Sequence, residues 1–240
     1  MSLKTRFGNL GNILDFDNLT EENIYVLDSP ILTNSQFKKF KKFFSKKTKT
    51  IDCTFNISSS LKERIEEIRE EAETSVRQGS TCIVLSDKNI TDQNASIPSI
   101  LTVGAVHSHL VKHGLRGYCS LNVECSDALD THSFAVLIGV GATTVNPYLA
   151  IDSIYQRFEK KLFGKSDFES CVLKFKKSID AGLLKIMSKM GISVISSYRG
   201  GCNFEAVGLS RAIVSDYFPG MSSRISGIGI SGIEDKIKEL

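Results

Sequence analysis

One order of residues recurs along this sequence and limits the folds open to it. A run with apolar residues every three or four positions begins after Ser60 and ends at Gly79, and the apolar residues 82–85 follow. Ser60 and Glu63 form a capping-box pattern, and glycine commonly follows a helix end. A helix, a glycine and a short buried strand form the repeating unit of a parallel α/β sheet or barrel. The predicted buried stripe of this helix is Leu61, Ile65, Ile68, Ala72 and Val76.

The same order returns further along the chain. Pro98 is well placed in the first turn of a helix that stops at Gly114, and residues 118–123 predict the next strand. A long helix is predicted to end at Gly191. We therefore expect an α/β protein. The other predicted elements are a strand over 51–55, a helix over 131–139, a short strand over 142–145, a helix over 148–161 and a strand over 205–209.

A polar, glycine-rich loop is the candidate functional segment. The apolar run 192–195 predicts a buried strand, and the loop 196–201 follows it. Loops after strands hold ligands and catalytic groups in many α/β proteins, although a glycine pair is also common in a plain turn. Arg199 and nearby backbone amides could bind a phosphate or a carboxylate. Alternatively, Arg199 pairs with a carboxylate such as Glu205 at a domain interface.

Composition excludes several classes of protein. The chain has no long apolar run, so we expect no membrane span, and its start has no signal-peptide pattern. Six scattered cysteines without a Cys-x-x-Cys pair are typical of free thiols in a reducing cytoplasm. Residues 38–49 carry seven lysines and no acid, which leaves the rest of the chain at a net −4. The whole chain therefore lacks the charge profile of a nucleic-acid-binding protein.

The lysine-rich segment predicts a short amphipathic helix. Asn34 or Ser35 can cap it, and Phe37, Phe40 and Phe44 share one face. One interpretation is a basic helix that binds RNA or a lipid surface. The favoured interpretation is an aromatic stripe docked on the protein, with the lysines in solvent.

The histidines and the paired glycines predict no metal or cofactor site. His109 and His113 lie four residues apart and could share an ion, but zinc needs a third ligand and no His-Glu-x-x-His pattern is present. His107 is interpreted as a core histidine. Gly139 and Gly141 resemble half of a dinucleotide fingerprint, but they precede the short strand and are interpreted as turn residues. No nucleophile, base and orienting group can be assembled from spacing, so no catalytic residue is predicted.

Several stretches of the chain together carry a family resemblance. They are residues 97–99, 103–110, 132–135, 138–142, 145–150, 183–193, 197–200 and 204–209. In this order they resemble the central domain of the large subunit of glutamate synthase. The resemblance runs from about Ser29 to Gly229 and so covers nearly the whole chain.

The resemblance implies a fold and a place in a larger enzyme. It implies a lead-in and basic helix over residues 1–50, followed by an α/β domain over residues 51–240. This domain is expected to be related to the barrels of FMN-linked oxidoreductases, as a complete or an incomplete barrel. The full enzyme makes two glutamates from glutamine and 2-oxoglutarate with a nicotinamide or ferredoxin reductant. An amidotransferase domain releases ammonia, and a later barrel holds FMN and an iron–sulfur cluster. The central domain joins them, helps form the ammonia passage and holds no cofactor.

The expected partners are therefore the amidotransferase and FMN domains of the same polypeptide, and a reductase small subunit in the full enzyme; no nucleic acid or membrane is expected. The chain lacks a nucleophilic cysteine at its start and stops before any flavin region, so we expect it to be inactive alone.

The candidates for a tunnel or interface are Ser196, Ser197, Tyr198, Arg199, Asn203 and Glu205. Cys202 and Asn203 depart from the family's usual residues, which leaves position 202 without a predicted role.

Two alternatives come from other classes of protein. The first is a flavin- or phosphate-binding enzyme domain that is complete in itself, which a flavin titration would reveal. The second is a binding module that uses the lysine-rich helix on RNA or lipid, whose binding would weaken with salt.

Overall fold

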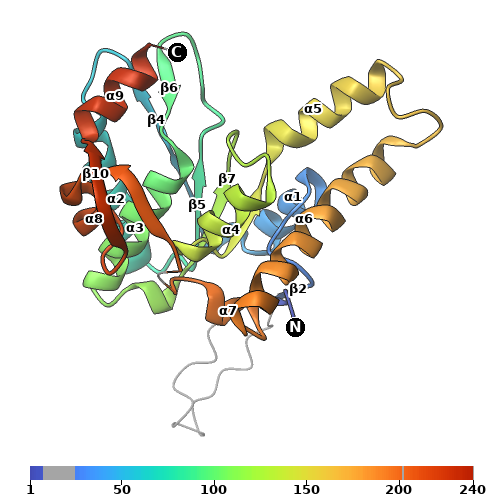
Figure 1. Ribbon diagram of the computed structural model, residues 1–240, viewed down its shortest axis with the longest axis horizontal. Coiled ribbons are helices and arrows are strands. Elements are labelled where there is room, and N and C mark those ends of the chain that lie inside the picture. The colour runs from blue at the N-terminus through green and yellow to red at the C-terminus, as the bar shows by residue number, and fades with distance from the viewer. Residues whose placement is uncertain (8–24, 202, 240) are drawn as a thin grey trace, which may run out of the picture.

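A computed structural model describes residues 1–7, 25–201 and 203–239 of the chain. Residues 8–24 of the predicted lead-in lie outside the described residues, and so does Cys202. The described part contains a sheet of four parallel strands, whose order across the sheet is the same as their order along the chain (Figure 1). In spatial order the strands are β3 (Thr48–Asp52), β5 (Cys82–Ser86), β7 (Ser120–Glu124) and β8 (Thr144–Asn146).

One face of this sheet is apolar and is covered by three helices. Alternate strand residues such as Ile83 and Leu121 belong to the same buried cluster as the helices. The five residues of the predicted stripe of the first helix are all buried, and Gly79 has the left-handed φ of 94°. Ser60 accepts a hydrogen bond from the Glu63 N–H, which confirms the predicted helix start. The helices are α2 (Leu61–Arg77), α3 (Ser99–Lys112) and α4 (Thr131–Gly139).

The opposite face of the sheet carries α1 (Asn34–Phe43). Phe37 and Phe40 are buried in a cluster with Cys82 and Val84, so the interpretation as a docked aromatic stripe is confirmed. The predicted cap is wrong by one or two residues. Thr33 caps the helix, because its side chain and that of Gln36 exchange hydrogen bonds with each other's backbone.

Several predicted strands differ in their bounds. The strand over 51–55 is split at Cys53, whose carbonyl accepts a hydrogen bond from the Ile97 N–H and so leaves the main ladder. β4 (Thr54–Asn56) then pairs antiparallel with β6 (Asn94–Ser96). Tyr118, the first residue of the strand predicted over 118–123, belongs to the short helix η3 (Arg116–Tyr118), and β7 begins at Ser120. Pro98 stands at the N-cap of α3, just before its first turn.

The predicted strand over 192–195 is wrong. Val194 makes a single bridge to Ser2, and Ile195 begins the short helix α7 (Ile195–Tyr198). The backbone here hydrogen-bonds to Ser2, through the Ser2 N–H and the Ser2 carbonyl. A strand needs a neighbouring ladder, and among the described residues this run meets only that one residue.

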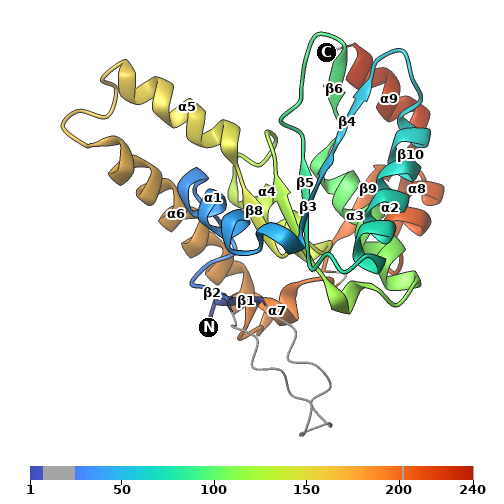
Figure 2. The same cartoon turned by 180° about the vertical axis from the view of Figure 1, so that it is seen from behind.

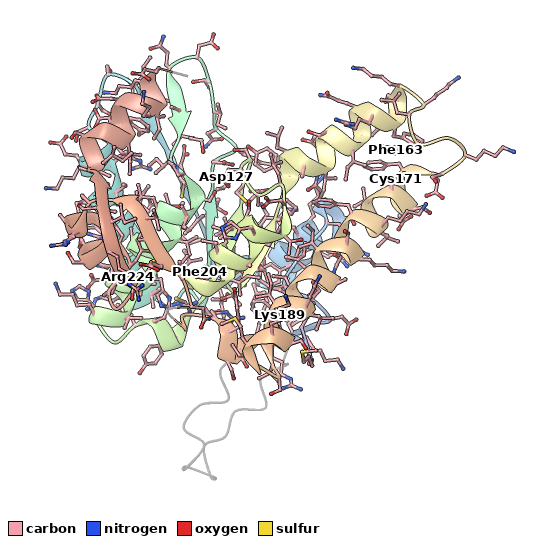
Figure 3. All side chains as sticks on the ribbon, in the orientation of Figure 1. Asp127, Phe163, Cys171, Lys189, Phe204 and Arg224 are labelled. Atoms are coloured by element: carbon pink, nitrogen blue, oxygen red, sulfur yellow. The ribbon has the colours of Figure 1, made fainter. Side chains whose placement is uncertain are left out.

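A long helical arm projects from the body of the protein (Figures 1 and 2). It consists of α5 (Tyr148–Glu159) and α6 (Phe168–Met190), with Phe163 in the connection at its far end (Figure 3). α6 ends at Gly191, which has a φ of 71°, as predicted. No helix of the described residues has both the length and the apolar content needed to cross a membrane.

The C-terminal part forms a separate parallel pair of strands, and its helix α8 (Arg211–Tyr217) packs against α3. The strand predicted over 205–209 is confirmed, but it pairs outside the main sheet. The remaining elements are β1 (Thr5–Phe7), β2 (Tyr25–Leu27), η2 (Ser45–Lys47), β9 (Glu205–Leu209), α8 (Arg211–Tyr217), β10 (Ser222–Ile228) and α9 (Ile230–Lys238). The α/β class is confirmed, while the described parallel strands form an open sheet, so a barrel stays a prediction.

Candidate functional site

Charged and polar side chains gather where the parallel strands end. Glu124, the last residue of β7, is buried and accepts a 2.9 Å hydrogen bond from the Ser86 hydroxyl. The Lys88 Nζ lies 2.9 Å from its Oε1, and the Lys41 Nζ lies 3.8 Å from its Oε2. Two cations from separate segments therefore neutralise one buried carboxylate.

Asp87 is a second buried carboxylate at this edge. It accepts hydrogen bonds from the N–H and the hydroxyl of Ser126, at 2.9 and 2.6 Å, and from the hydroxyl of Ser96 at 3.0 Å. Burial, and then the neighbouring Asp87 charge, raise the pKa of Tyr148 above its ordinary value. The ring of Tyr148 lies 5.0 Å from the Lys88 Nζ. The loops after β5, β7 and β8 are joined through these contacts.

Polar side chains of β7 and β8 also form hydrogen bonds within the sheet, next to this edge. The Thr144 hydroxyl donates to the Asn122 Oδ1 at 2.7 Å, and the Asn146 Nδ2 donates to the Leu32 carbonyl at 2.9 Å. This cluster was not predicted from the sequence. Its signal was the alternation in β7 and β8, where every second residue is polar. The cluster's described groups bond mainly to each other, so the arrangement holds strand ends together.

The predicted loop lies at the other end of the sheet. The Gly200 N–H donates to the Gly139 carbonyl at 2.8 Å, and the Arg199 Nε donates to the Ala142 carbonyl at 3.1 Å. Both acceptors precede β8, so the loop borders the amino-terminal edge of the strands. The prediction that it follows a strand at a carboxyl end is wrong, because residues 192–195 form no strand.

Within this loop the candidate residues have different surroundings. Ser196 and Ser197 are exposed on α7. Tyr198 is buried, and burial raises its pKa to about 12. Its ring meets Phe204 edge-on, and its carbonyl accepts a 3.1 Å hydrogen bond from the Asn203 Nδ2. Tyr198 and Asn203 are thus brought together, while the two serines face outward.

Arg199 and Glu205 are not paired with each other. The Glu205 Oε1 lies 3.4 Å from the Arg224 Nε, across the β9–β10 pair. Arg199 instead lies near Arg116, and burial, followed by the charge of Arg116, lowers the pKa of Arg199 to about 10. Neither Arg116 nor Arg199 makes an ion pair with a carboxylate in the described part of the chain.

Arg116 and His107 form the rest of this basic cluster. The Arg116 guanidinium donates to the His107 Nδ1 at 3.0 Å and to the carbonyls of Cys119 and Gly141 at 2.6 and 2.8 Å. Burial, then Arg116 and Arg199, lower the pKa of His107 to about 4, so the ring is a neutral acceptor. The interpretation of His107 as a hydrogen-bonded core histidine is confirmed.

Gly141 provides the space for that histidine. Its φ is 131°, and a Cβ at this position would lie 2.4 Å from the His107 Nδ1. The turn role predicted for this glycine is therefore confirmed. The close approach of the His107 ring to the backbone is a second reason for a glycine at this position.

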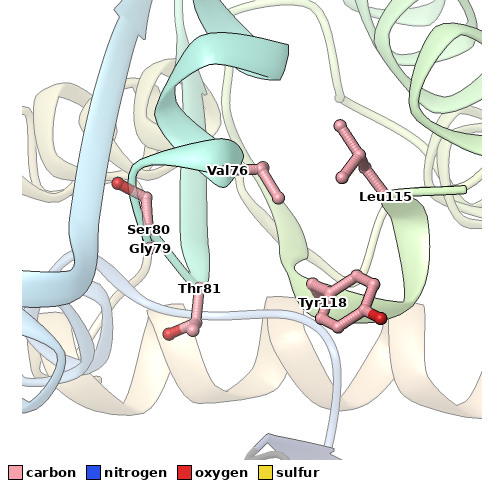
Figure 4. Close-up of a pocket in the computed structure, with 6 residues that line it drawn as sticks. All are labelled: Val76, Gly79, Ser80, Thr81, Leu115 and Tyr118. Atoms are coloured by element: carbon pink, nitrogen blue, oxygen red, sulfur yellow. The ribbon is translucent and has the colours of Figure 1, made fainter. Parts of the chain in front are cut away.

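A small hollow lies at the same edge, between the end of α2 and η3 (Figure 4). Its volume is about 220 Å³, below the roughly 300–1,000 Å³ of common ligand sites. Its lining offers no charged side chain for the phosphate of a flavin. The described lining residues are Val76, Gly79, Ser80, Thr81, Leu115 and Tyr118.

Comparisons with known proteins cover nearly all of the chain. The sequence model of the glutamate synthase central domain matches residues 1–210. The NADPH glutamate synthase large chain of Azospirillum brasilense is 53% identical, over all of this chain and 16% of that protein. The corresponding chain of Bacillus subtilis (strain 168) is 40% identical, over 88% of this chain and 14% of that protein. The ferredoxin-dependent glutamate synthase of Pyropia yezoensis is 36% identical, over 96% of this chain and 16% of that protein.

Proposed function

Because the chain belongs to the glutamate synthase central domain family, we propose that it is the central part of a glutamate synthase large chain. The main support for this proposal is the 53% identity between this chain, over all of its residues, and part of such a large chain. The chain spans only 14–16% of its first relatives, so amidotransferase and FMN domains would lie elsewhere in the polypeptide. The whole enzyme would form glutamate from glutamine and 2-oxoglutarate, as an oxidoreductase that uses NADPH, NADH or ferredoxin.

In that enzyme the chain would act as a scaffold between the two catalytic domains. The parallel strands lie in chain order with α2, α3 and α4 on one face, an arrangement found in half of a (β/α)8 barrel. This order supports a relation to the FMN-linked barrels. FMN and the iron–sulfur cluster would belong to another domain of the polypeptide, as the family resemblance implies. The buried, unpaired thiols of the described residues support a reducing compartment such as the cytoplasm.

The basic cluster supports an interface at the amino-terminal edge of the sheet. Arg116 and Arg199 bring two positive charges together, and burial lowers the pKa of each guanidinium. A carboxylate from a neighbouring domain would relieve this repulsion and form a charge-assisted pair. Exposed Ser196 and Ser197 lie on the same short helix, α7, that leads to Arg199, and they would supply polar walls for ammonia, together with Tyr198 and its partner Asn203.

The test is the Arg199→Ala variant of the intact enzyme. We expect the ratio of glutamine hydrolysis to glutamate formation to be about fivefold higher in the variant than in the wild type. This change corresponds to about 1 kcal/mol of lost coupling between the two sites. Both rates are measured in one assay, as ammonia released and glutamate formed. Arg211→Ala, an exposed arginine on α8, is the matched control. An unchanged ratio for Arg199→Ala would remove this loop from the coupling.

A further inference from the structure

Three metal-ligating side chains meet in the helix layer, near the C-terminal ends of α2 and α3. Glu73 comes from α2, His109 lies in the last turn of α3, and His113 is the C-cap residue of α3. One ligand atom from each lies within 4.8 Å of the other two. The two helices pack side by side (Figure 1), so a shared ion would join them.

The distances between these atoms suit a tetrahedral ion. Zinc binds imidazole nitrogen and carboxylate oxygen at about 2.0–2.1 Å, so two of its tetrahedral ligands lie about 3.3 Å apart. The Glu73 Oε2 lies 2.6 Å from the His109 Nε2 and 3.7 Å from the His113 Nδ1. These separations fall on either side of the required value, and side-chain rotation alone can equalise them.

The chemistry of the three groups selects among metals. Two imidazoles and one carboxylate suit zinc and its neighbours among the divalent transition metals, whereas magnesium and calcium prefer oxygen ligands alone. All three side chains are partly exposed, which leaves room for a water at the fourth position. We propose that Glu73, His109 and His113 bind a divalent zinc-class cation that ties α2 to α3.

Two existing contacts compete with the ion. Glu73 also pairs with Arg77 at 2.7 Å, and the His113 Nδ1 lies 2.9 Å from the His109 carbonyl. Metal binding replaces the second contact through a rotation of the exposed His113 ring. Without a metal, the same residues form a hydrogen-bonded cluster, so the two states predict different results on addition of zinc.

The test compares zinc binding by variants of the purified protein, at the full length in which it occurs in its cell. Each protein is stripped with a chelator, dialysed against micromolar zinc chloride and analysed for bound metal. We expect His113→Ala and the double variant H109A/H113A to lose one bound zinc ion relative to the wild type, with affinity lowered at least about tenfold. Zinc should also raise the melting temperature of this domain in the wild type and not in the double variant.

Controls separate this result from unrelated binding or misfolding. His132→Ala removes an exposed histidine on α4 and should bind zinc like the wild type. Glu73→Gln keeps the side-chain shape and should weaken binding. Circular dichroism checks that each variant is folded. Equal zinc content in the wild type and the folded double variant, or binding only at millimolar zinc, would overturn the proposal.

Discussion

The Lys88 ammonium nitrogen lies 2.9 Å from Oε1 of Glu124, a carboxylate whose side chain is only 5% exposed. Replacing Lys88 with methionine would leave this buried charge with a more distant cation at 3.8 Å, Lys41. We expect the free energy of unfolding to fall by about 2 kcal/mol, less than the full cost of an unpaired buried charge. Urea unfolding of the 240-residue chain measures this loss.

The matched control for this prediction is Lys62→Met, which changes an exposed lysine on α2 and should leave stability nearly unchanged. Adding Glu124→Gln to Lys88→Met removes the unpaired charge and should recover part of the loss. Equal stability of the two single lysine variants would show that Lys88 does not compensate Glu124.

Gly104 allows α3 and the end of α8 to approach closely. A Cβ here would lie 2.3 Å from the Phe218 ring and 2.9 Å from the Tyr217 carbonyl. Alanine favours a helix over glycine by up to about 1 kcal/mol, but overpacking costs about 1–3 kcal/mol. We therefore expect Gly104→Ala to lower stability by about 1–2 kcal/mol in urea unfolding.

Gly117→Ala is the control, because a Cβ at that position meets no atom within 4 Å. Phe218→Leu in the Gly104→Ala background should restore part of the stability by removing the clashing ring atoms. A Gly104→Ala variant more stable than the wild type would mean that helix propensity outweighs the clash.

His107 should make stability depend on pH. Its pKa is about 4 in the folded protein and 6.5 ordinarily, so in this range the unfolded chain binds a proton that the folded chain does not. Stability from the neutral ring is complete above about pH 6.5 and is lost as pH falls toward about 4, by up to about 2 kcal/mol after allowance for partial exposure. Urea midpoints across this range measure the loss.

His107→Gln retains an acceptor for Arg116 but does not titrate, so its stability should fall less over the same range. Carboxylates with lowered pKa values, such as Asp130, contribute equally to both proteins and cancel in the comparison. Parallel pH curves for the wild type and His107→Gln would contradict the prediction.

Local patterns predicted most helices and several strands well. The stripe of α2, its start at Ser60 and the helix stop at Gly191 depend on residues within one or two turns of each other. The prediction of a strand over 192–195 was wrong because a strand forms only where a second strand provides its hydrogen-bond partners. Apolar β-branched residues indicate burial, and here Ile195 is buried at the start of a helical turn.

The candidate loop was located by residue type, but its contacts were not predictable. Arg199 had a carboxylate or a ligand as its expected partner, and its observed acceptor is the Ala142 carbonyl, 57 residues away along the chain. Glu205 pairs with Arg224 because β9 and β10 lie side by side. Such pairs depend on how elements pack, which no local spacing encodes.

The amino-acid order alone was sufficient for the α/β class, for most of the helices and several of the strands, and for the family. These follow from side-chain periodicity, caps and matched motifs, which act over short stretches. Packing in three dimensions determined which polar side chains of β7 and β8 meet across the sheet, which edge the Arg199 loop borders, and that Glu73 meets His109 and His113. The reason is physical: residues 36 positions apart become neighbours only when α2 and α3 bury their apolar faces on the same side of one sheet.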